Sequence, residues 1–348
     1  MKDIPIIDTS KFLAQGGDDE QCVALKDAVS HYGLAIILDE RVEPGLPVKY
    51  REVAQEVFKL PPDVKAKYIQ PPLEDGRQLY ENGWRPPFTE RPRRRDEVLH
   101  LIPDQAKPKD PPSEDPKERL MYPFGKPRQG SQFPTIDLAE PIIVNEVEGY
   151  RETSEAWGRT MYMVLMTVAQ MLAIGFGEPR DLFWSLLEHG PHRLAPTGLD
   201  LSKWGPGTVA AGFHNDMSAF TLHGMSNWPG LWAWTRFWEK FAVRLPDERH
   251  LLLQVGRALE HLTAGAVMRG YHEVVIGEER QDILRALLLA GQKPWRVTTT
   301  SFCHIATDSW LEPIGGFVNL PLAEKYIVQR ILSGARQEES IFRKARRA

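Results

Sequence analysis

The chain has 348 residues, of which 42% are hydrophobic and 26% are charged. This composition supplies enough apolar side chains for a sizeable core, which excludes a disordered or fibrous protein. The 43 Lys and Arg residues against 47 Asp and Glu residues give a formal net charge of −4, so no overall positive field favours nucleic acid or an anionic membrane. We therefore expect no nucleic-acid or membrane partner, and no protein partner is implied.

Two cysteines, Cys22 and Cys303, lie far apart in the sequence and form no CxxC pair. This usage disfavours a disulfide framework, a thiolate zinc site and an iron–sulfur cluster. Residues 1–10 carry three charged side chains and no apolar secretory core, so we expect a cytoplasmic protein. The uncharged run Thr160–Gly177 reaches the length of a membrane span, but its polar residues favour a buried core helix.

The first part of the chain is expected to alternate short strands and helices. Ile4–Ile7 and Leu34–Leu38 are apolar runs typical of strands. Glu20–Tyr32 and Pro47–Lys59 favour helices, the first of them closed by Gly33.

A proline-rich segment follows these elements. Eight prolines between Pro103 and Pro134 remove backbone donors, so we expect a loop over the surface or at the mouth of a site. We assign residues 1–145 to an N-terminal helical and loop region and residues 146–348 to a long helix with a β core. Together they form a single unit over residues 1–348.

The second part begins with a long helix and then changes to β structure. The helix is expected over Glu146–Phe176, and Gly177 and Pro179 end it. Seven short segments rich in β-branched and aromatic residues follow at regular spacing, each bounded by Gly, Pro, Asn or Asp. This pattern predicts a mainly β fold with flanking helices, either a barrel or a jelly roll. The segments are Val209–Phe213, Ala219–Leu222, Leu231–Thr235, Phe241–Arg244, Leu251–Val255, His272–Ile276 and Val297–Phe302.

His214 and Asp216 lie at the end of one expected strand with a single residue between them. Alternate side chains of a strand share a face, so both would point into a barrel while Asn215 points away. The pattern alone is weak, because about 1.4 His-x-acid matches are expected by chance in such a chain. The alternative is a solvated pair at a strand end.

A second histidine, His272, opens a later expected strand that a barrel can bring beside the first. Two imidazoles and one carboxylate leave positions open on an octahedral ion, which is the arrangement that Fe(II) oxygenases use. Zinc is less suited, because it prefers a nearly closed tetrahedron. The alternative for His272 is a strand histidine bonded to a neighbouring carbonyl.

Arg296 and Thr298 also alternate on one expected strand, so the guanidinium and the hydroxyl face the same way. This combination suits the carboxylate of a small molecule. An arginine inside a barrel needs an anion, and a bound dicarboxylate would supply it. The alternative is an internal salt bridge to one of the 47 acidic residues.

These residues, in this order, resemble the motifs of the Fe(II)/2-oxoglutarate-dependent oxygenases of the isopenicillin N synthase-like group. The likeness extends over nearly the whole chain. The matching stretches are Ile4–Asp8, His214-Asn215-Asp216, Gly256–Thr263, His272, Arg296-Val297-Thr298 and the closing segment Arg296–Pro313.

The resemblance implies a double-stranded β-helix, or cupin-like jelly roll, with iron held by His214, Asp216 and His272. It also implies that Arg296 and Thr298 hold the distal carboxylate of 2-oxoglutarate. The implied activity is that of a dioxygenase that uses Fe(II), 2-oxoglutarate and O₂. Such an enzyme would oxidise a C–H bond of a small molecule, such as an amino acid or carboxylate of specialised metabolism, by hydroxylation, desaturation or ring closure.

Three departures from the family pattern stand out. Thr298 replaces the commoner serine and keeps the hydroxyl. Arg257 occupies a position where an aspartate is common, although that position is not a ligand. The gap between His272 and Arg296 is longer than in many relatives, and Arg280–Ala290 within it resembles an inserted amphipathic helix.

Arg85 and Arg193 are candidates for binding a carboxylate of the substrate, with a structural role as the alternative for each. Two other classes of function remain open. One is an Fe(II)/O₂ oxidase of the same fold that does not use 2-oxoglutarate. The other is a non-catalytic, cupin-like binding module.

Overall fold

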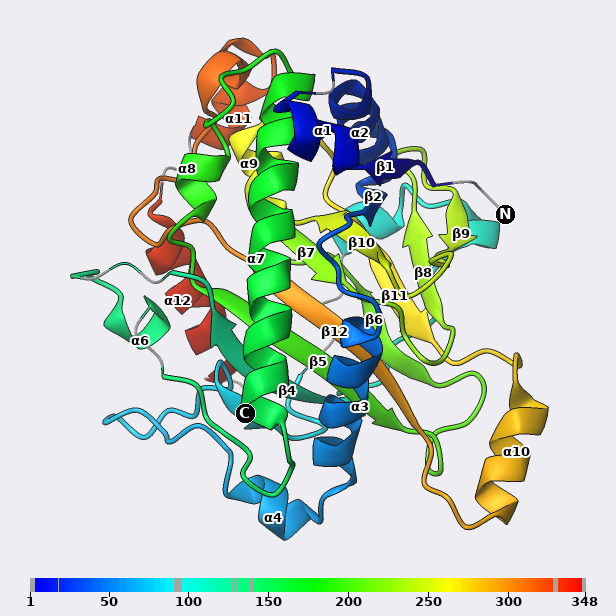
Figure 1. Cartoon of the computed structure of the whole chain (residues 1–348). Coiled ribbons are helices and arrows are strands. Elements are labelled where there is room, and N and C mark those ends of the chain that lie inside the picture. Colours follow the sequence, from blue (N-terminus) through cyan, green and yellow to red (C-terminus); the bar gives the residue numbers. More distant parts are fainter. Residues whose placement is uncertain are drawn as a thin grey trace.

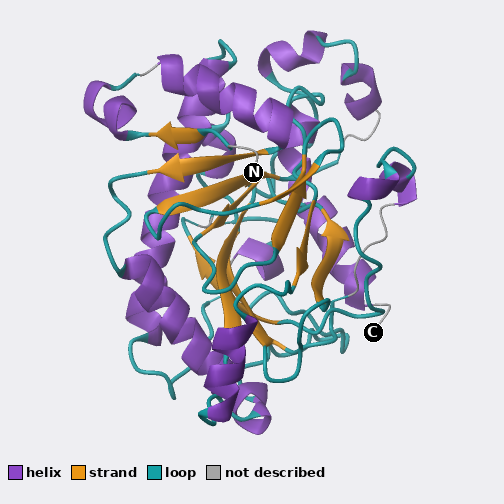
Figure 2. Cartoon of the chain, turned by 90° about the vertical axis from the view of Figure 1, so that its right-hand side faces the viewer, coloured by secondary structure: helices purple, strands orange, loops and turns teal. Residues whose placement is uncertain are grey.

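The computed structural model describes residues 4–17, 19–90, 96–126, 128, 130–137, 140–327 and 331–345. Within this part of the chain the strands form two sheets that lie in the interior of the molecule, with helices around them (Figures 1 and 2). The strands are β1 (Ile6–Asp8), β2 (Leu34–Leu38), β3 (Gly83–Arg85), β4 (Glu118–Phe124), β5 (His192–Asp200), β6 (Val209–His214), β7 (Phe220–His223), β8 (Leu231–Trp234), β9 (Lys240–Ala242), β10 (His250–Val255), β11 (His272–Val275) and β12 (Trp295–Cys303).

The larger sheet has eight strands in the order β1-β2-β10-β7-β12-β5-β4-β3, and the smaller has four in the order β6-β11-β8-β9. All neighbours are antiparallel except the parallel pair β1 and β2. Strands β1 to β4, from the expected N-terminal region 1–145, therefore join one sheet with β5, β7, β10 and β12 from the region 146–348. The β core with flanking helices is confirmed, and the division at residue 145 stays a prediction.

The helices lie mainly around the larger sheet. They are α1 (Ser10–Gln15), α2 (Asp19–Tyr32), α3 (Leu46–Lys59), α4 (Pro62–Ala66), α5 (Asp96–Leu99), α6 (Pro134–Asp137), α7 (Tyr150–Gly175), α8 (Trp184–Leu187), α9 (Arg257–Leu262), α10 (Gln281–Leu289), α11 (Ala323–Ile327) and α12 (Ser333–Ala345), with short 3-10 turns at Asp104–Ala106 and Gly315–Asn319. The helix expected over Arg280–Ala290 is thus present as α10.

The long helix α7 crosses one face of the larger sheet and contacts β4, β7, α2 and α3 (Figure 1). Its apolar side chains, among them Trp157, Leu165 and Leu172, are fully buried. Trp157 also stacks on Tyr50 of α3, with ring centroids 5.8 Å apart. The run Thr160–Gly177 is thereby accounted for as core packing, and no helix of the described residues is long and apolar enough to cross a membrane.

The proline-rich segment corrects one expectation, because it contains the strand β4. Strand β4 pairs with β3 on one side and with β5 on the other. Its ladder with β3 covers only residues 119–121, so Pro123 lies beyond it and removes no donor there. Pro127 of the same segment lies outside the described residues.

Strand β5 was not among the expected segments, and it contains Pro196 and Gly198, two residue types that are unfavourable inside strands. The β4–β5 ladder is interrupted between Arg119 and Tyr122, and Pro196 faces this interruption, so its missing N–H breaks no pairing with β4. Gly198 is needed for packing. A Cβ atom there would lie 2.5 Å from Cδ2 of Phe58.

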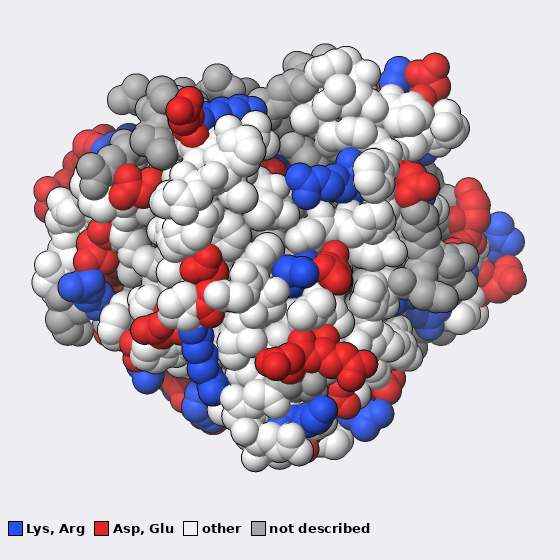
Figure 3. Space-filling model, turned by 90° about the horizontal axis from the view of Figure 1, so that it is seen from above, with Lys and Arg blue, Asp and Glu red and all other residues white. Residues whose placement is uncertain are grey.

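The surface charge agrees with the nearly balanced composition. Figure 3 shows Lys and Arg interspersed with Asp and Glu over the face seen from above. No large single-sign field covers the described residues of that face.

Buried His192 gives the fold a pH dependence. Burial, with a smaller contribution from His304, lowers its pKa from 6.5 to about 3, so it is neutral in the native protein. Below pH 6.5 the His192 side chain binds a proton in the unfolded chain but not in the native protein. The free energy of unfolding therefore falls as the pH falls towards 3.

We expect His192→Asn to reduce this loss. The asparagine keeps an acceptor for the His304 N–H, which bonds to Nδ1 of His192 at 3.1 Å, but it does not titrate. Urea unfolding between pH 6.5 and 4 should show a slope smaller by about 1.4 kcal/mol per pH unit. An unchanged slope would contradict this origin of the acid sensitivity.

Candidate functional site

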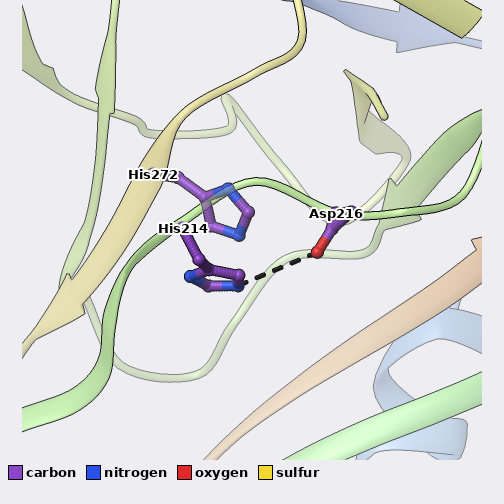
Figure 4. A group of neighbouring side chains, drawn as sticks. All are labelled: His214, Asp216 and His272. Atoms are coloured by element: carbon purple, nitrogen blue, oxygen red, sulfur yellow. Dashed lines mark ion pairs between the residues drawn. The ribbon is translucent and has the colours of Figure 1, made fainter. Parts of the chain in front are cut away.

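His214, Asp216 and His272 come together where β6 and β11 meet. His214 ends β6, His272 begins β11, and the two residues face each other in the antiparallel pair. Asp216 follows in the turn after β6. Each side chain offers one ligand atom, and these atoms lie within 4.8 Å of one another (Figure 4). The strand pairing thus brings the two histidines together, as expected. Asp216 joins them from the loop beyond β6, and not from the same strand as the spacing had suggested.

The hydrogen bonds of His214 and Asp216 leave one free ligand atom on each side chain. His214 Nδ1 lies 2.6 Å from the carbonyl oxygen of Gly212, which favours a proton on Nδ1 and an open lone pair on Nε2. The Thr221 hydroxyl donates to Oδ2 of Asp216 at 2.6 Å, so Oδ1 stays available. The two available atoms are 3.7 Å apart. Such outer contacts orient ligands towards a metal ion.

The surroundings of His214 and Asp216 favour the protonation states that can bind a cation. Burial lowers the pKa of His214 far below its usual value, and His272 lowers it further. Burial alone would raise the pKa of Asp216, but His272, His214 and the Thr221 hydroxyl more than offset this and hold the pKa below its usual value. At neutral pH the pair is therefore a neutral imidazole beside a carboxylate, which are the protonation states that bind metal.

His272 has its own support, which the sequence analysis missed. The ring centroids of His214 and His272 are 4.1 Å apart. Nδ1 of His272 lies 2.7 Å from the side-chain amide of Gln254, which leaves Nε2 free. Gln254 also contacts His223 at 3.0 Å. A signal was present, since Gln254 is a polar residue within the apolar strand β10.

Asn215, between the two ligands of β6, was expected to point away from the barrel. Its side chain is buried, and neither of its amide atoms has a hydrogen-bond partner among the described residues.

Arg296 is a buried cation on β12. Only 5% of the residue is exposed, and its Nε donates to the Pro229 carbonyl at 3.3 Å. Burial lowers its pKa to about 10, so the guanidinium is still charged at neutral pH. Among the described residues no carboxylate forms an ion pair with it, and the alternative of an internal salt bridge is not supported. Half-buried Thr298 follows two residues later on the same face of β12.

Comparison with known proteins identifies this architecture. Residues 4–123 match the family model described as the N-terminal region of the non-haem dioxygenase in morphine synthesis. A 2OG-Fe(II) oxygenase family protein from Caulobacter crescentus superimposes with a TM-score of 0.75 and 18% identity, over 99% of each chain. The chain has the fold of the 2OG-Fe(II) oxygenases.

Other proteins of this fold are also similar to the chain. A full-length protein from Neurospora crassa, solved with alpha-KG and thymine, gives a TM-score of 0.72 and 20% identity over 99% of this chain and 97% of that protein. The dioxygenase for auxin oxidation 1 from Arabidopsis thaliana, solved with 2-oxoglutarate, gives 0.62 and 17% over 91% and 98%. No match is found among curated proteins. The expected jelly roll and the family resemblance are confirmed.

The two arginines expected to contact substrate already have protein partners within the oxygenase fold. Nη1 of Arg85 is 3.0 Å from Glu90, and its other nitrogens bond to Thr89. Arg193 donates to the backbone carbonyls of Glu81, His192 and Ile136. These contacts support the structural alternative, and substrate binding by either arginine stays a prediction.

A buried cluster of charged side chains lies beside the candidate metal-binding residues, and the sequence did not predict it. Glu90 forms ion pairs with Arg85, Lys117 and Arg119 at 2.7 to 3.0 Å. Lys117 also pairs with Asp115, whose Oδ1 accepts from the backbone N–H of Gly212 at 3.4 Å, on the strand of His214. Asp115, Lys117 and Arg119 belong to the segment Pro103–Pro134, which was predicted as a loop over the surface or at the mouth of a site. That prediction gave no reason to expect buried ion pairs.

Removal of one candidate ligand should abolish metal binding. We expect His214→Ala and Asp216→Ala each to weaken Fe(II) binding by more than about 100-fold, beyond the 10–100-fold that loss of an outer contact causes. Anaerobic titration calorimetry measures this directly. His189→Ala, at an exposed histidine, is the matched control and should bind like the wild type. Tight binding by the His214 variant would exclude this residue as a ligand.

Proposed function

We propose that the protein is a non-haem oxygenase that depends on Fe(II) and 2-oxoglutarate and oxidises a C–H bond of a small molecule. One observation carries this proposal. A cluster of two histidines and one carboxylate lies in the same β core as Arg296, a buried cation without a carboxylate partner among the described residues. A metal-binding face together with a free anion-binding group is what a keto diacid requires.

The residues divide the work as follows. His214, Asp216 and His272 would hold iron through two imidazole nitrogens and one carboxylate oxygen. Arg296 binds the distal carboxylate of 2-oxoglutarate, and the hydroxyl of Thr298 donates a further hydrogen bond. Bound iron, when present, supplies the activation of O₂ that is coupled to decarboxylation of 2-oxoglutarate to succinate and CO₂. The surrounding β core excludes water and orients the substrate carbon.

The two alternatives fit the site less well. An oxidase that takes all electrons from its substrate has no use for a second anion site, yet Arg296 remains buried and charged. A non-catalytic binding module has no need of oriented ligands, whereas His214 Nδ1 and Asp216 Oδ2 both have hydrogen-bond partners that leave the ligand atoms free.

We further propose that the substrate is a small molecule with an acidic group, such as an amino acid. The buried cluster around Glu90 supports this, because within the described part of the chain its three cations outnumber its two carboxylates. The cations are Arg85, Lys117 and Arg119, and the carboxylates are Glu90 and Asp115. The Neurospora crassa protein, with a similar fold, was solved with thymine, which is likewise a small molecule.

The proposed location is the cytoplasm, with no nucleic-acid, membrane or protein partner. The nearly balanced charge of the chain supports the absence of a polyanionic partner. Cys22 and Cys303 are both buried thiols that form no disulfide, which suits a reducing compartment.

Arg296→Leu should raise the KM for 2-oxoglutarate. Loss of a charge-assisted contact costs about 1.5–3 kcal/mol, which corresponds to roughly 10–150-fold. Succinate release at varied 2-oxoglutarate concentration measures the change. Arg285→Leu, at an exposed arginine of α10, is the control and should leave the KM unchanged. Equal KM values in the two variants would show that Arg296 does not bind the co-substrate.

A screen of amino acids and small carboxylates should identify the substrate and the type of reaction. We expect an acidic compound to stimulate succinate release. Mass spectrometry of the product then separates hydroxylation, which adds one oxygen atom, from desaturation or ring closure, which removes two hydrogens. Oxygen consumption without succinate would favour the 2-oxoglutarate-independent oxidase instead.

A further inference from the structure

A chain of hydrogen bonds leads from His272 into the wall of the larger sheet. The amide of Gln254 lies between two imidazoles, with its nitrogen 2.7 Å from Nδ1 of His272 and its oxygen 3.0 Å from Nε2 of His223. On the far side of His223, Nδ1 lies 3.3 Å from the hydroxyl of Thr300. All four residues are buried, so each of these contacts lacks competition from bulk water.

The strand register explains why these residues meet. On β7, Thr221 and His223 share the inner face, and on β10 the same face carries Gln254, which pairs with Thr221. Thr300 of β12 pairs with His223. Three adjacent strands of the larger sheet therefore bring a polar chain to the ligand that begins β11.

The chemistry of imidazole fixes the polarity of this chain once a metal is bound. If Nε2 of His272 gives its lone pair to the ion, the neutral ring must carry its proton on Nδ1. That proton needs an acceptor, and an amide nitrogen cannot accept it. The amide oxygen of Gln254 must then turn to His272, and the amide nitrogen must donate to His223.

We propose that Gln254 and His223 are positioning residues for the metal ligand His272, and that metal binding sets the direction of the whole hydrogen-bond chain. In the metal-bound protein Nδ1–H of His272 donates to Gln254, whose amide donates to Nε2 of His223. Nδ1–H of His223 then donates to Thr300. In the structure the amide nitrogen faces His272 and the amide oxygen faces His223, an arrangement that places the proton of His223 on Nε2.

This inference rests on the proposed metal site, and a competing geometry exists. The carbonyl oxygen of Gly270 lies 3.3 Å from Nδ1 of His272 and could accept its proton without any change at Gln254. The tautomer of His223 separates the two cases. Reversal of the chain places the proton of His223 on Nδ1, whereas donation to Gly270 leaves it on Nε2.

The test uses the full chain with ¹⁵N-labelled histidine and Zn(II) as a diamagnetic substitute for Fe(II). Long-range ¹H–¹⁵N spectra report the tautomer of each ring and the ligation of His214 and His272. We expect zinc to move the proton of His223 from Nε2 to Nδ1. The buried ring of His192, which contacts none of these groups in the structure, serves as an internal reference that should not change.

Two variants at Gln254 make the test specific. Gln254→Glu supplies oxygens only, so it can accept from both rings. We expect zinc-bound Gln254→Glu to bind the metal while His223 keeps its proton on Nε2. Gln254→Leu breaks the chain, and we expect it to weaken zinc binding by about 10–100-fold. If the leucine variant fails to fold, the glutamate variant still decides the question.

A matched pair on β12 tests the far end of the chain. Thr300→Val removes the acceptor for His223, and we expect a mixture of His223 tautomers in the zinc-bound protein. Thr299→Val is the control, because Thr299 is also buried, on the opposite face, and its hydroxyl has no partner among the described residues.

The possible results are distinguishable. Zinc shifts at His214 and His272 with His223 on Nε2 in the wild type would overturn the inference and leave the metal site intact. No zinc shift at either ligand would overturn both the inference and the proposed function. The expected tautomer change without any succinate formation would sustain the inference and refute only the proposed oxygenase activity.

Discussion

The antiparallel pairing of β6 with β11 is the constraint on which the site depends. It sets His272 opposite His214, although the two residues are distant in the sequence. The pair belongs to the smaller sheet, while Arg296 and Gln254 belong to the larger one. The candidate centre is therefore assembled across the two layers, and its geometry requires that both sheets keep their register and their relative position.

Several of the candidate site residues and helices could be predicted from the local sequence. The alternation of side chains along a strand was enough to place Arg296 and Thr298 on one face of β12, because that regularity extends over only two residues. It does not apply to Asp216, which follows the end of β6. The helices α2, α3 and α7 also followed from apolar periodicity and glycine stops. The order of these motifs along the chain then pointed to a family whose fold is now confirmed.

The parts that were missed depend on contacts between distant segments. Prolines are unfavourable inside strands, yet Pro123 is accepted in β4 because it lies beyond the ladder with β3. Pro196 is accepted in β5 because it faces a gap in the ladder with β4. Gln254 and His223 carry no motif, since their proximity follows from the register of β10 against β7. Glu90 gathers three cations because β3 and β4 lie side by side, and that pairing was itself not foreseen.

Strand β12 serves two neighbourhoods at once. Its even-numbered residues Arg296, Thr298 and Thr300 share one face. Val297 belongs to the main apolar core on the other face. If β12 slipped by one position, Val297 would take the place of Arg296 on one face. Arg296 would then enter the apolar core on the other face. A misregistered fold would therefore be destabilised by the same alternation that places the candidate binding groups on one face. The protein can fold stably only in the register that also forms the site.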